Sequence, residues 1–298
     1  MADTRAQAYA AQLDALTKMA DALTPEARRR ILALLGDLNR EILADLATST
    51  PASYTGARLR MLKAEVERAT QRFADQASAD VQKLEASTFQ RTAVQIDTTV
   101  AAAAGGVMVH PVIDDAALRV VQGYTADLIT GLSRDTSAKI NAAIQRAYLG
   151  GLSLPQLAEQ IGRTLEGGSF SGLFSQIGER AMTIATNEIM RVQSLASIAR
   201  INDLATRHAG LGKMWKHIPV ARVPRPSHII ADGQIRKPGE AFLVEGEALQ
   251  YPRDPAGRAE NTINCHCLVV PYVPEEYLKP TDADRALLRS YGLSVQAA

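Results

Sequence analysis

The sequence predicts an α-rich protein of several domains, in which extended helical N-terminal and middle regions precede a small α+β module. Three observations lead to this fold class. Apolar residues recur every three or four positions over residues 5–95, the period of a helix with one buried face. Aromatic residues make up only 5% of the chain, and the abundant alanine is typical of helix-packing surfaces. Beyond residue 210 the helical period stops and prolines become frequent, which favours short strands and turns.

Residues 1–97 form the first predicted region, and it consists of helices. Pro25 suits the first position of a helix, so we expect a new helix to begin there. Its apolar face runs from Ile31 to Leu46, and a turn around Pro51 separates it from the next helix. That next helix carries an apolar seam at helical spacing, made of Leu59, Leu62, Val66, Ala69 and Phe73.

The same helix carries a series of basic residues, namely Arg58, Arg60, Lys63, Arg68 and Arg72. Two interpretations are open: a stripe that contacts DNA, or a solvated face in which Glu65 and Glu67 balance the charge. We favour the solvated face. The whole chain has a formal net charge of only +1, which does not indicate a nucleic-acid-binding protein.

Residues 98–112 contain a Gly-Gly pair and are expected to form a hinge or an extended connection. Residues 113–210 are predicted to be a second helical region that ends in a long helix. A short helix there should begin at Ser153, with Leu157 and Ile161 facing inward. The other helices expected in this region span about 114–133, 136–148 and 176–208.

Residues 211–280 are predicted to fold as a compact α+β module, and residues 281–298 as a short helix with a loose tail. Two short apolar runs, Phe242–Val244 and Leu268–Val270, indicate strands of the module. The module also holds the residues with the most distinctive chemistry in the chain. Both cysteines, Cys265 and Cys267, lie there two positions apart, and on a strand they would point to the same side.

A short helix is expected upstream of the cysteines. Pro226 suits its first turn, and Gly233 suits the left-handed position that ends it. His228 and Asp232 are four apart on that helix and would share a face. Three of the five histidines of the chain lie between positions 217 and 266, so potential ligands are concentrated in this segment.

These residues allow two interpretations of the cluster. Cys265, Cys267 and His228 could hold a tetrahedral Zn²⁺ ion. The fourth ligand would then come from Asp232, His217 or His266. Alternatively, His228 and Asp232 form a hydrogen-bonded pair while the cysteines pack as small apolar side chains. We rank the second interpretation first, and no cofactor other than this candidate Zn²⁺ is expected.

A catalytic interpretation is also open, since a cysteine beside a histidine can act as a thiolate nucleophile. A second cysteine two residues away adds nothing to that chemistry, and no Gly-rich loop adjoins the pair to hold an oxyanion. The chain also has no phosphate-binding Gly loop. We therefore predict that the protein is not an enzyme.

The sequence also bears on the cellular compartment. The N-terminal residues are not followed by an apolar core, so we expect no secretory signal. The run from Val100 to Val109 is too short to span a bilayer, which takes about 20 apolar residues. Two closely spaced cysteines do not make a secreted disulfide framework. We expect a soluble protein made in a reducing cytoplasm, without membrane contact.

Taken in order, the motifs of the module resemble those of the phage Mu protein F-like family, the minor head or head morphogenesis proteins of tailed phages. The resemblance covers roughly residues 175–273 and includes a helix at residues 180–191. It departs from the family's pattern mildly at Asn187 and again at His266, where the family usually has a basic residue between the cysteines. The motifs that carry it are Trp215, Arg-Pro-Ser-His at 225–228, Asp-Gly-Gln at 232–234, Phe242, Tyr-Pro-Arg-Asp-Pro at 251–255 and Ile-Asn-Cys-His-Cys at 263–267.

The resemblance implies a structural component of the virion head that is assembled in the host cytoplasm. Its expected partners are the portal protein and the major capsid protein, with packaged DNA and further copies of itself as additional candidates. Its expected role is in capsid assembly, DNA packaging or ejection. For such a protein the expected structural motif consists of Arg225, His228, Asp232, Gly233, Asn264, Cys265 and Cys267. The alternative is an enzyme or toxin-like module that uses the His/Asp/Cys cluster, with or without a metal.

Overall fold

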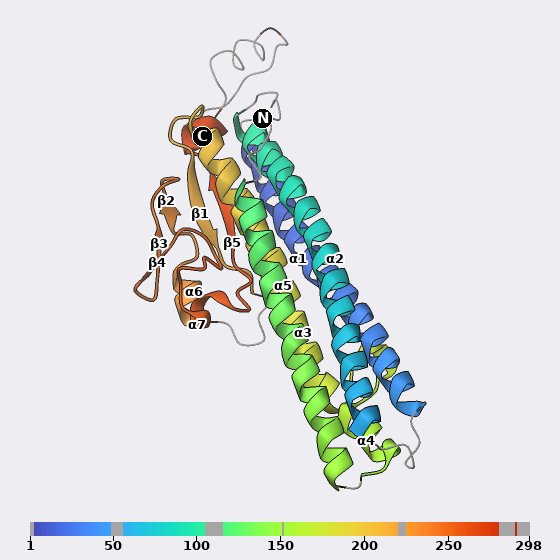
Figure 1. Ribbon diagram of the computed structural model, residues 1–298. Coiled ribbons are helices and arrows are strands. Elements are labelled where there is room, and N and C mark those ends of the chain that lie inside the picture. The colour runs from blue at the N-terminus through green and yellow to red at the C-terminus, as the bar shows by residue number, and fades with distance from the viewer. Residues whose placement is uncertain are drawn as a thin grey trace. The chain divides into compact units, whose positions relative to one another are not determined.

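The computed structural model describes residues 3–48, 56–104, 116–150, 152–219, 225–279 and 290. Long helices make up most of the described chain up to residue 205, and the strands follow it, which confirms the predicted fold class (Figure 1). The helices are α1 (Asp3–Ala47), α2 (Gly56–Ala104), α3 (Ala116–Gly150), α4 (Leu154–Ile161), α5 (Gly172–Ala205), α6 (Pro226–Ile230), α7 (Ala259–Thr262) and α8 (Glu275–Leu278). The strands are β1 (Gly212–Lys216), β2 (Ile235–Arg236), β3 (Phe242–Val244), β4 (Glu247–Leu249) and β5 (Leu268–Tyr272).

The chain divides into two compact units, each made of several segments. The first, called here the module unit, comprises Met1–Leu23, Ala86–Leu118 and Met190–Ala298. The second, the bundle unit, comprises Thr24–Glu85 and Arg119–Ile189. The boundaries expected near residues 97, 112 and 210 do not separate these units, because α1, α2 and α5 each contribute residues to both.

Two predicted helix breaks are wrong. Helix α1 continues through Pro25, and Leu23 and Ala27 on either side of it are both buried. Proline removes one backbone donor from a helix, and here the continuous apolar face outweighs that loss. Helix α3 likewise runs without a break past Thr136, whose hydroxyl donates to the carbonyl of Leu132 at 2.8 Å.

The expected hinge is also wrong over part of its length. Residues 98–104 belong to α2, because Val100 and Ala103 continue its buried face. Residues 105–112 of the expected hinge lie outside the described residues, as does nearly all of the helix and tail expected at 281–298. The helix predicted at 176–208 is confirmed as α5 with shifted ends.

The bundle unit buries apolar residues from each of its long helices. Its short helix α4 begins with a reciprocal cap between Ser153 and the side chain of Gln156. Leu157 and Ile161 of α4 are buried, as predicted. Asn39 of α1 fixes the segment after α4, since its Nδ2 donates to the carbonyl of Gly162 at 2.9 Å.

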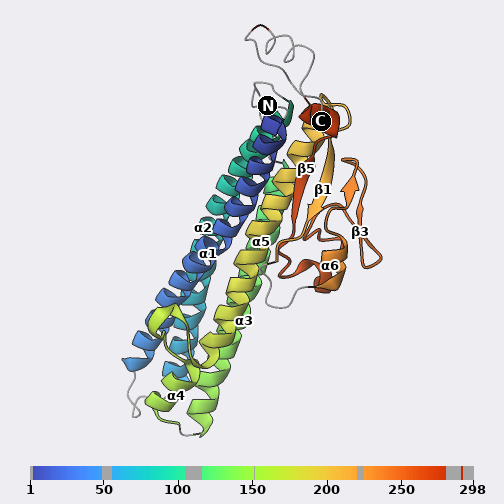
Figure 2. The same cartoon turned by 180° about the vertical axis from the view of Figure 1, so that it is seen from behind.

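The module unit contains a three-stranded antiparallel sheet with strand order β2-β1-β5, and β3 and β4 form a separate hairpin. In the pairing of β1 with β5, Met214 lies opposite Val270. The strands predicted at 242–244 and 268–270 are confirmed as β3 and β5. β1 and β5 lie along the C-terminal part of α5, which both side views show (Figures 1 and 2).

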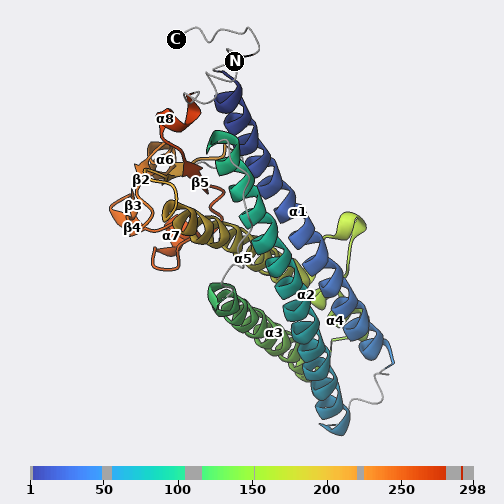
Figure 3. The same ribbon diagram turned by 90° about the horizontal axis from the view of Figure 1, so that it is seen from above.

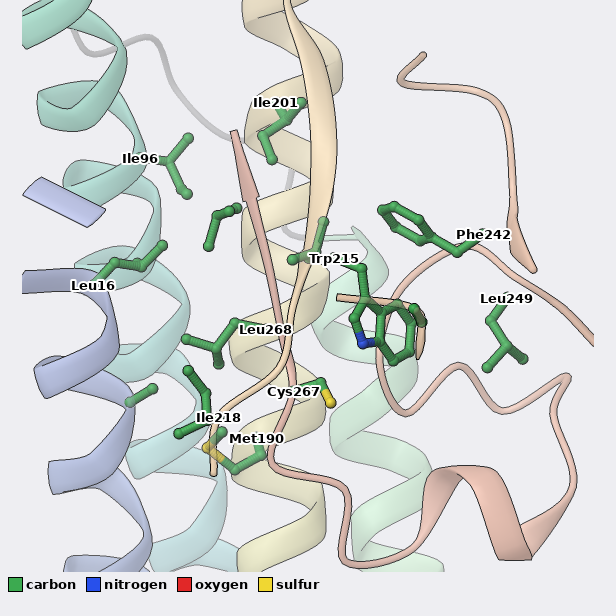
Figure 4. Close-up of a cluster of buried hydrophobic side chains, with 14 of the residues drawn as sticks. Leu16, Ile96, Met190, Ile201, Trp215, Ile218, Phe242, Leu249, Cys267 and Leu268 are labelled. Carbon is green, nitrogen blue, oxygen red and sulfur yellow. The ribbon is translucent and has the colours of Figure 1, made fainter. Parts of the chain in front are cut away.

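One apolar core joins the sheet of the module unit to its helices. Figure 4 shows Leu16 and Ile96 on one side of β1 and β5, and Trp215 and Phe242 on the other. The N-terminal part of α1 and the C-terminal part of α2 run side by side in this unit (Figure 3). In the described part of the chain, none of the helices combines the length and apolar character that crossing a membrane requires.

Candidate functional site

The site lies where α6 meets β1. Pro226 is in the first turn of α6, as predicted. Gly233 has the predicted left-handed conformation, with a φ of 75°, but it does not end the helix: α6 ends at Ile230, and Ala231 is its C-cap. The turn is joined to β1 by two backbone hydrogen bonds, from Gly233 N to Trp215 O at 2.9 Å and from Trp215 N to Gln234 O at 3.0 Å. The short helix is therefore held at a fixed distance from the sheet.

The structure does not pair His228 with Asp232, so this prediction is wrong. Asp232 Oδ1 instead accepts a hydrogen bond from the backbone N–H of His217 at 2.8 Å. His228 Nδ1 faces the two cysteines, at 3.5 Å from Cys265 Sγ and 3.4 Å from Cys267 Sγ. The Asp232 carboxylate accepts from a backbone amide at the end of β1, so it orders the backbone there rather than the side chain of His228.

The three side chains of this cluster are buried and close together. His228 is 3% exposed, Cys265 4% and Cys267 2%. One potential ligand atom from each lies within 4.8 Å of the other two. Both cysteines are free thiols. Their sulfurs approach the same histidine nitrogen, although β5 begins only at Leu268.

The remaining candidate ligands lie differently. His217 Nδ1 is 3.7 Å from Cys267 Sγ, and this histidine is partly buried. His266 is also partly buried but does not belong to the group of three. Asp232 is engaged with a backbone amide. Among the described residues, His217 is therefore the candidate fourth ligand that lies against a sulfur of the cluster.

The electrostatics of the two thiols are linked. Hydrogen bonding to Cys267 lowers the pKa of Cys265 well below its usual value, and His228 adds to this effect while burial opposes it. The same interaction between the thiols raises the pKa of Cys267, with burial adding to the effect. The first deprotonation of this pair is therefore easier, and the second harder, than for an isolated thiol.

Arg253 is a structural residue of the site that the sequence indicated only as part of a motif. Its side chain is fully buried, and it donates from Nη1 to the carbonyl of Cys265 and from Nη2 to Ser194 Oγ at 2.6 Å. It thereby joins the cysteine segment to α5. A charged residue inside a proline-rich motif was the signal that could have identified it.

Two other residues of the predicted structural motif support the same segment. Arg225 precedes α6 and donates from Nη2 to the carbonyl of Ile263 at 2.6 Å. Asn264 has a φ of 55°, the left-handed conformation that asparagine tolerates better than most residues. These two residues direct the chain from α7 into Cys265, so that both sulfurs lie beside His228.

The comparisons with known proteins cover the segment that holds this site. Residues 138–270 match the family model described as Phage Mu protein F like protein. The matched segment includes the whole cluster and extends further towards the N-terminus than the motifs indicated. One similar curated protein is the Uncharacterized protein YqbB of Bacillus subtilis (strain 168), 33% identical over 103 residues. That alignment covers 34% of this chain and 33% of the relative, so the chain matches about a third of that protein's length. No solved structure matches.

Proposed function

Residues 138–270 are Mu protein F-like, and from this we propose that the chain is a head morphogenesis protein of a phage and a structural component of the virion. In this proposal it contacts the portal protein and the major capsid protein and acts in capsid assembly, DNA packaging or ejection. The family match is the observation that carries the proposal. Its residues include α5 and most of the strands, where the most distinctive motifs lie.

The construction of the cluster supports a structural role over catalysis. Cys265 and His228 are within hydrogen-bonding distance, as a nucleophile and its base would be, yet both are buried. A substrate would have to displace the surrounding core to reach them. The side chains of Arg225, Asp232 and Arg253 hold backbone groups in place. These are the roles expected of residues that determine a fold.

The charge distribution supports contact with protein rather than bulk DNA. Arg58 lies 3.8 Å from Glu65, and Arg72 pairs with Glu41 of α1. At least two of the basic residues on α2 are therefore balanced by acidic neighbours. With a net charge of +1, steering by the field of the whole protein is weak.

Co-purification tests the proposal. The chain is co-expressed with the portal protein and the major capsid protein encoded in the same genome, and the complex is isolated through a tag on either partner. We expect the chain to be retained by at least one of them. A chain that stays monomeric and binds neither contradicts the proposal.

A matched pair of variants locates the contact. Ile230 of α6 is 82% exposed and lies in the family-matched segment, whereas Val120 of α3 is 74% exposed and lies outside it. If the matched segment makes the contact, Ile230→Asp lowers the recovery of the complex, by roughly tenfold for a residue at the centre of an interface. Val120→Asp serves as the control and should leave recovery unchanged.

A further inference from the structure

We propose that His228, Cys265 and Cys267 bind one Zn²⁺ ion, and that His217 provides the fourth ligand. The site is structural: it joins α6 to the segment that enters β5. This inference rests on the arrangement of the four side chains and is independent of the proposed role in the phage head.

The distances among the side chains fit one tetrahedral ion. With Zn–S near 2.3 Å and Zn–N near 2.0–2.1 Å, a sulfur and a nitrogen on the same tetrahedron lie about 3.5 Å apart. His228 Nδ1 is 3.5 Å from Cys265 Sγ and 3.4 Å from Cys267 Sγ. His217 Nδ1 is 3.7 Å from Cys267 Sγ. All three sulfur–nitrogen distances are therefore close to a tetrahedral edge.

Hydrogen bonds alone account poorly for the same arrangement. A nitrogen of neutral imidazole has either one proton or one lone pair, so His228 Nδ1 makes one good hydrogen bond. Here two sulfurs approach it at nearly equal distances. A metal ion at the centre of the group bonds to all of these atoms at once and removes the conflict.

The surroundings suit thiolate ligands. The Trp215 and His228 rings meet edge to face with centroids 5.7 Å apart, and Figure 4 shows the Cys267 sulfur on the side of the indole. Trp215 Nε1 is buried without a hydrogen-bond partner among the described residues, so its N–H is available to a thiolate of the cluster.

The other ring nitrogen of His228 leaves Nδ1 as the ligand atom. His228 Nε2 is buried without a hydrogen-bond partner among the described residues. The polar contacts of the ring are therefore those of Nδ1, the nitrogen that faces both sulfurs.

The position of His217 makes it the ligand that must adjust. It directly follows β1, and its backbone N–H is fixed by Asp232 at 2.8 Å. Its side chain is partly buried and lies against Cys267 at the edge of the group. His217 does not belong to the group of three, so in this proposal its ring must rotate towards His228 to reach the ion, whereas the other three ligands already face one another.

Metal analysis of the full chain tests the proposal. The protein is purified under reducing conditions, freed of metal with a chelator, and titrated with Zn²⁺ alone. We expect about one Zn²⁺ per chain and a higher melting temperature for the loaded protein. Co²⁺ in place of Zn²⁺ should give thiolate-to-metal charge-transfer absorption. A wild-type chain that takes up no Zn²⁺ and shows no change in melting temperature overturns the proposal.

Variants then assign the ligands. Cys265→Ser, Cys267→Ser and His228→Gln should each weaken Zn²⁺ binding by roughly 100-fold or more, beyond the effect of losing an outer-shell partner. His266→Gln is the matched control, because His266 lies between the two cysteines without joining the group. The affinity of this variant for Zn²⁺ should equal that of the wild type. Equal losses in His266→Gln and His228→Gln would overturn the ligand assignment.

The fourth ligand and the folding of the variants need separate measurements. His217→Gln should weaken binding less than the cysteine variants, and full affinity in this variant rules out His217 as the fourth ligand. If a cysteine variant fails to fold, the thiolate-to-metal charge-transfer absorption of the Co²⁺-loaded wild type replaces it as the readout. A chain that binds no Zn²⁺ but still binds the portal protein overturns the zinc site alone, so the two proposals fail separately.

Discussion

Replacing Arg200 with methionine should destabilise the module unit strongly. Arg200 of α5 is 2% exposed and pairs through Nε with Asp97 of α2, which is 3% exposed. Removing the guanidinium takes this cation away from a buried carboxylate, a change that typically costs about 3–5 kcal/mol. Because proteins are stable by about 5–15 kcal/mol in total, the variant should unfold at a much lower urea concentration.

The double variant Arg200→Met/Asp97→Leu gives the sharper test. Arg200 Nη2 is buried without a hydrogen-bond partner in the described part of the chain, so the native pair already carries a desolvation cost. Arg200 also pairs with Asp203, which keeps its ion pair with Arg207 in the variants. Apolar replacement of both buried partners should therefore recover most of the lost stability. Urea unfolding of the wild type, both single variants and the double variant forms a double-mutant cycle. A double variant as unstable as the sum of the two single variants would refute this reasoning.

The other predictions concern separate parts of the chain. Gly162→Ala should lower stability by more than about 2 kcal/mol in a thermal melt, because the φ of Gly162 is 93° and an added Cβ would collide with the backbone carbonyl of Ser171. Gly123 has open space around it, so Gly123→Ala should be neutral or stabilising in the same melt. Burial lowers the pKa of Lys213 to about 8, so between pH 8 and the usual lysine pKa the folded state binds fewer protons than the unfolded state, and stability should rise with pH. Urea titrations at several pH values should show this rise in the wild type and not in Lys213→Met. Burial raises the pKa of Tyr9 to about 12, so its contribution to stability is present below pH 10 and is lost between pH 10 and 12; Tyr9→Phe should remove that loss in the same titrations.

The helical class could be predicted from the sequence because the helix period is a local property. The short helix after Ser153 was predicted with its inward residues, since its start depends on a reciprocal cap between neighbours in the chain. The break expected at Pro25 was wrong for the opposite reason. Whether a helix continues through proline depends on the apolar partners of its buried face, and these come from distant segments.

The candidate site could be predicted in part for a similar reason. The chemistry of Cys265, Cys267 and His228 predicts that they form one group, and the structure brings them together. The partner of Asp232 was predicted wrongly, because helix spacing pointed to His228 whereas the donor is the backbone N–H of His217. Spacing along one helix cannot reveal a donor that a neighbouring strand provides.

The motifs of the module are best understood as a set of side-chain contacts to backbone groups. Gln234 pairs with both backbone groups of Leu243: its Nε2 donates to the carbonyl at 3.1 Å, and its Oε1 accepts from the N–H at 2.7 Å. Asp254 accepts from the backbone N–H of Gln250 at 2.8 Å and of Ala256 at 3.0 Å. These contacts supplement the few hydrogen bonds that such short strands form with one another.

This construction explains why reactive residue types occur buried in this segment. The helices and strands described between residues 226 and 262 are each two to five residues long, so none of them is stable alone. Polar side chains hold their ends, and Trp215 and Phe242 supply the apolar centre, with ring centroids 5.4 Å apart. A Zn²⁺ ion bound by His228 and the cysteines would join the two ends of this segment directly. The loss of that ion should therefore loosen residues 226–267 before it affects α5, a difference that hydrogen exchange measures residue by residue; equal loss of protection in both would contradict this order.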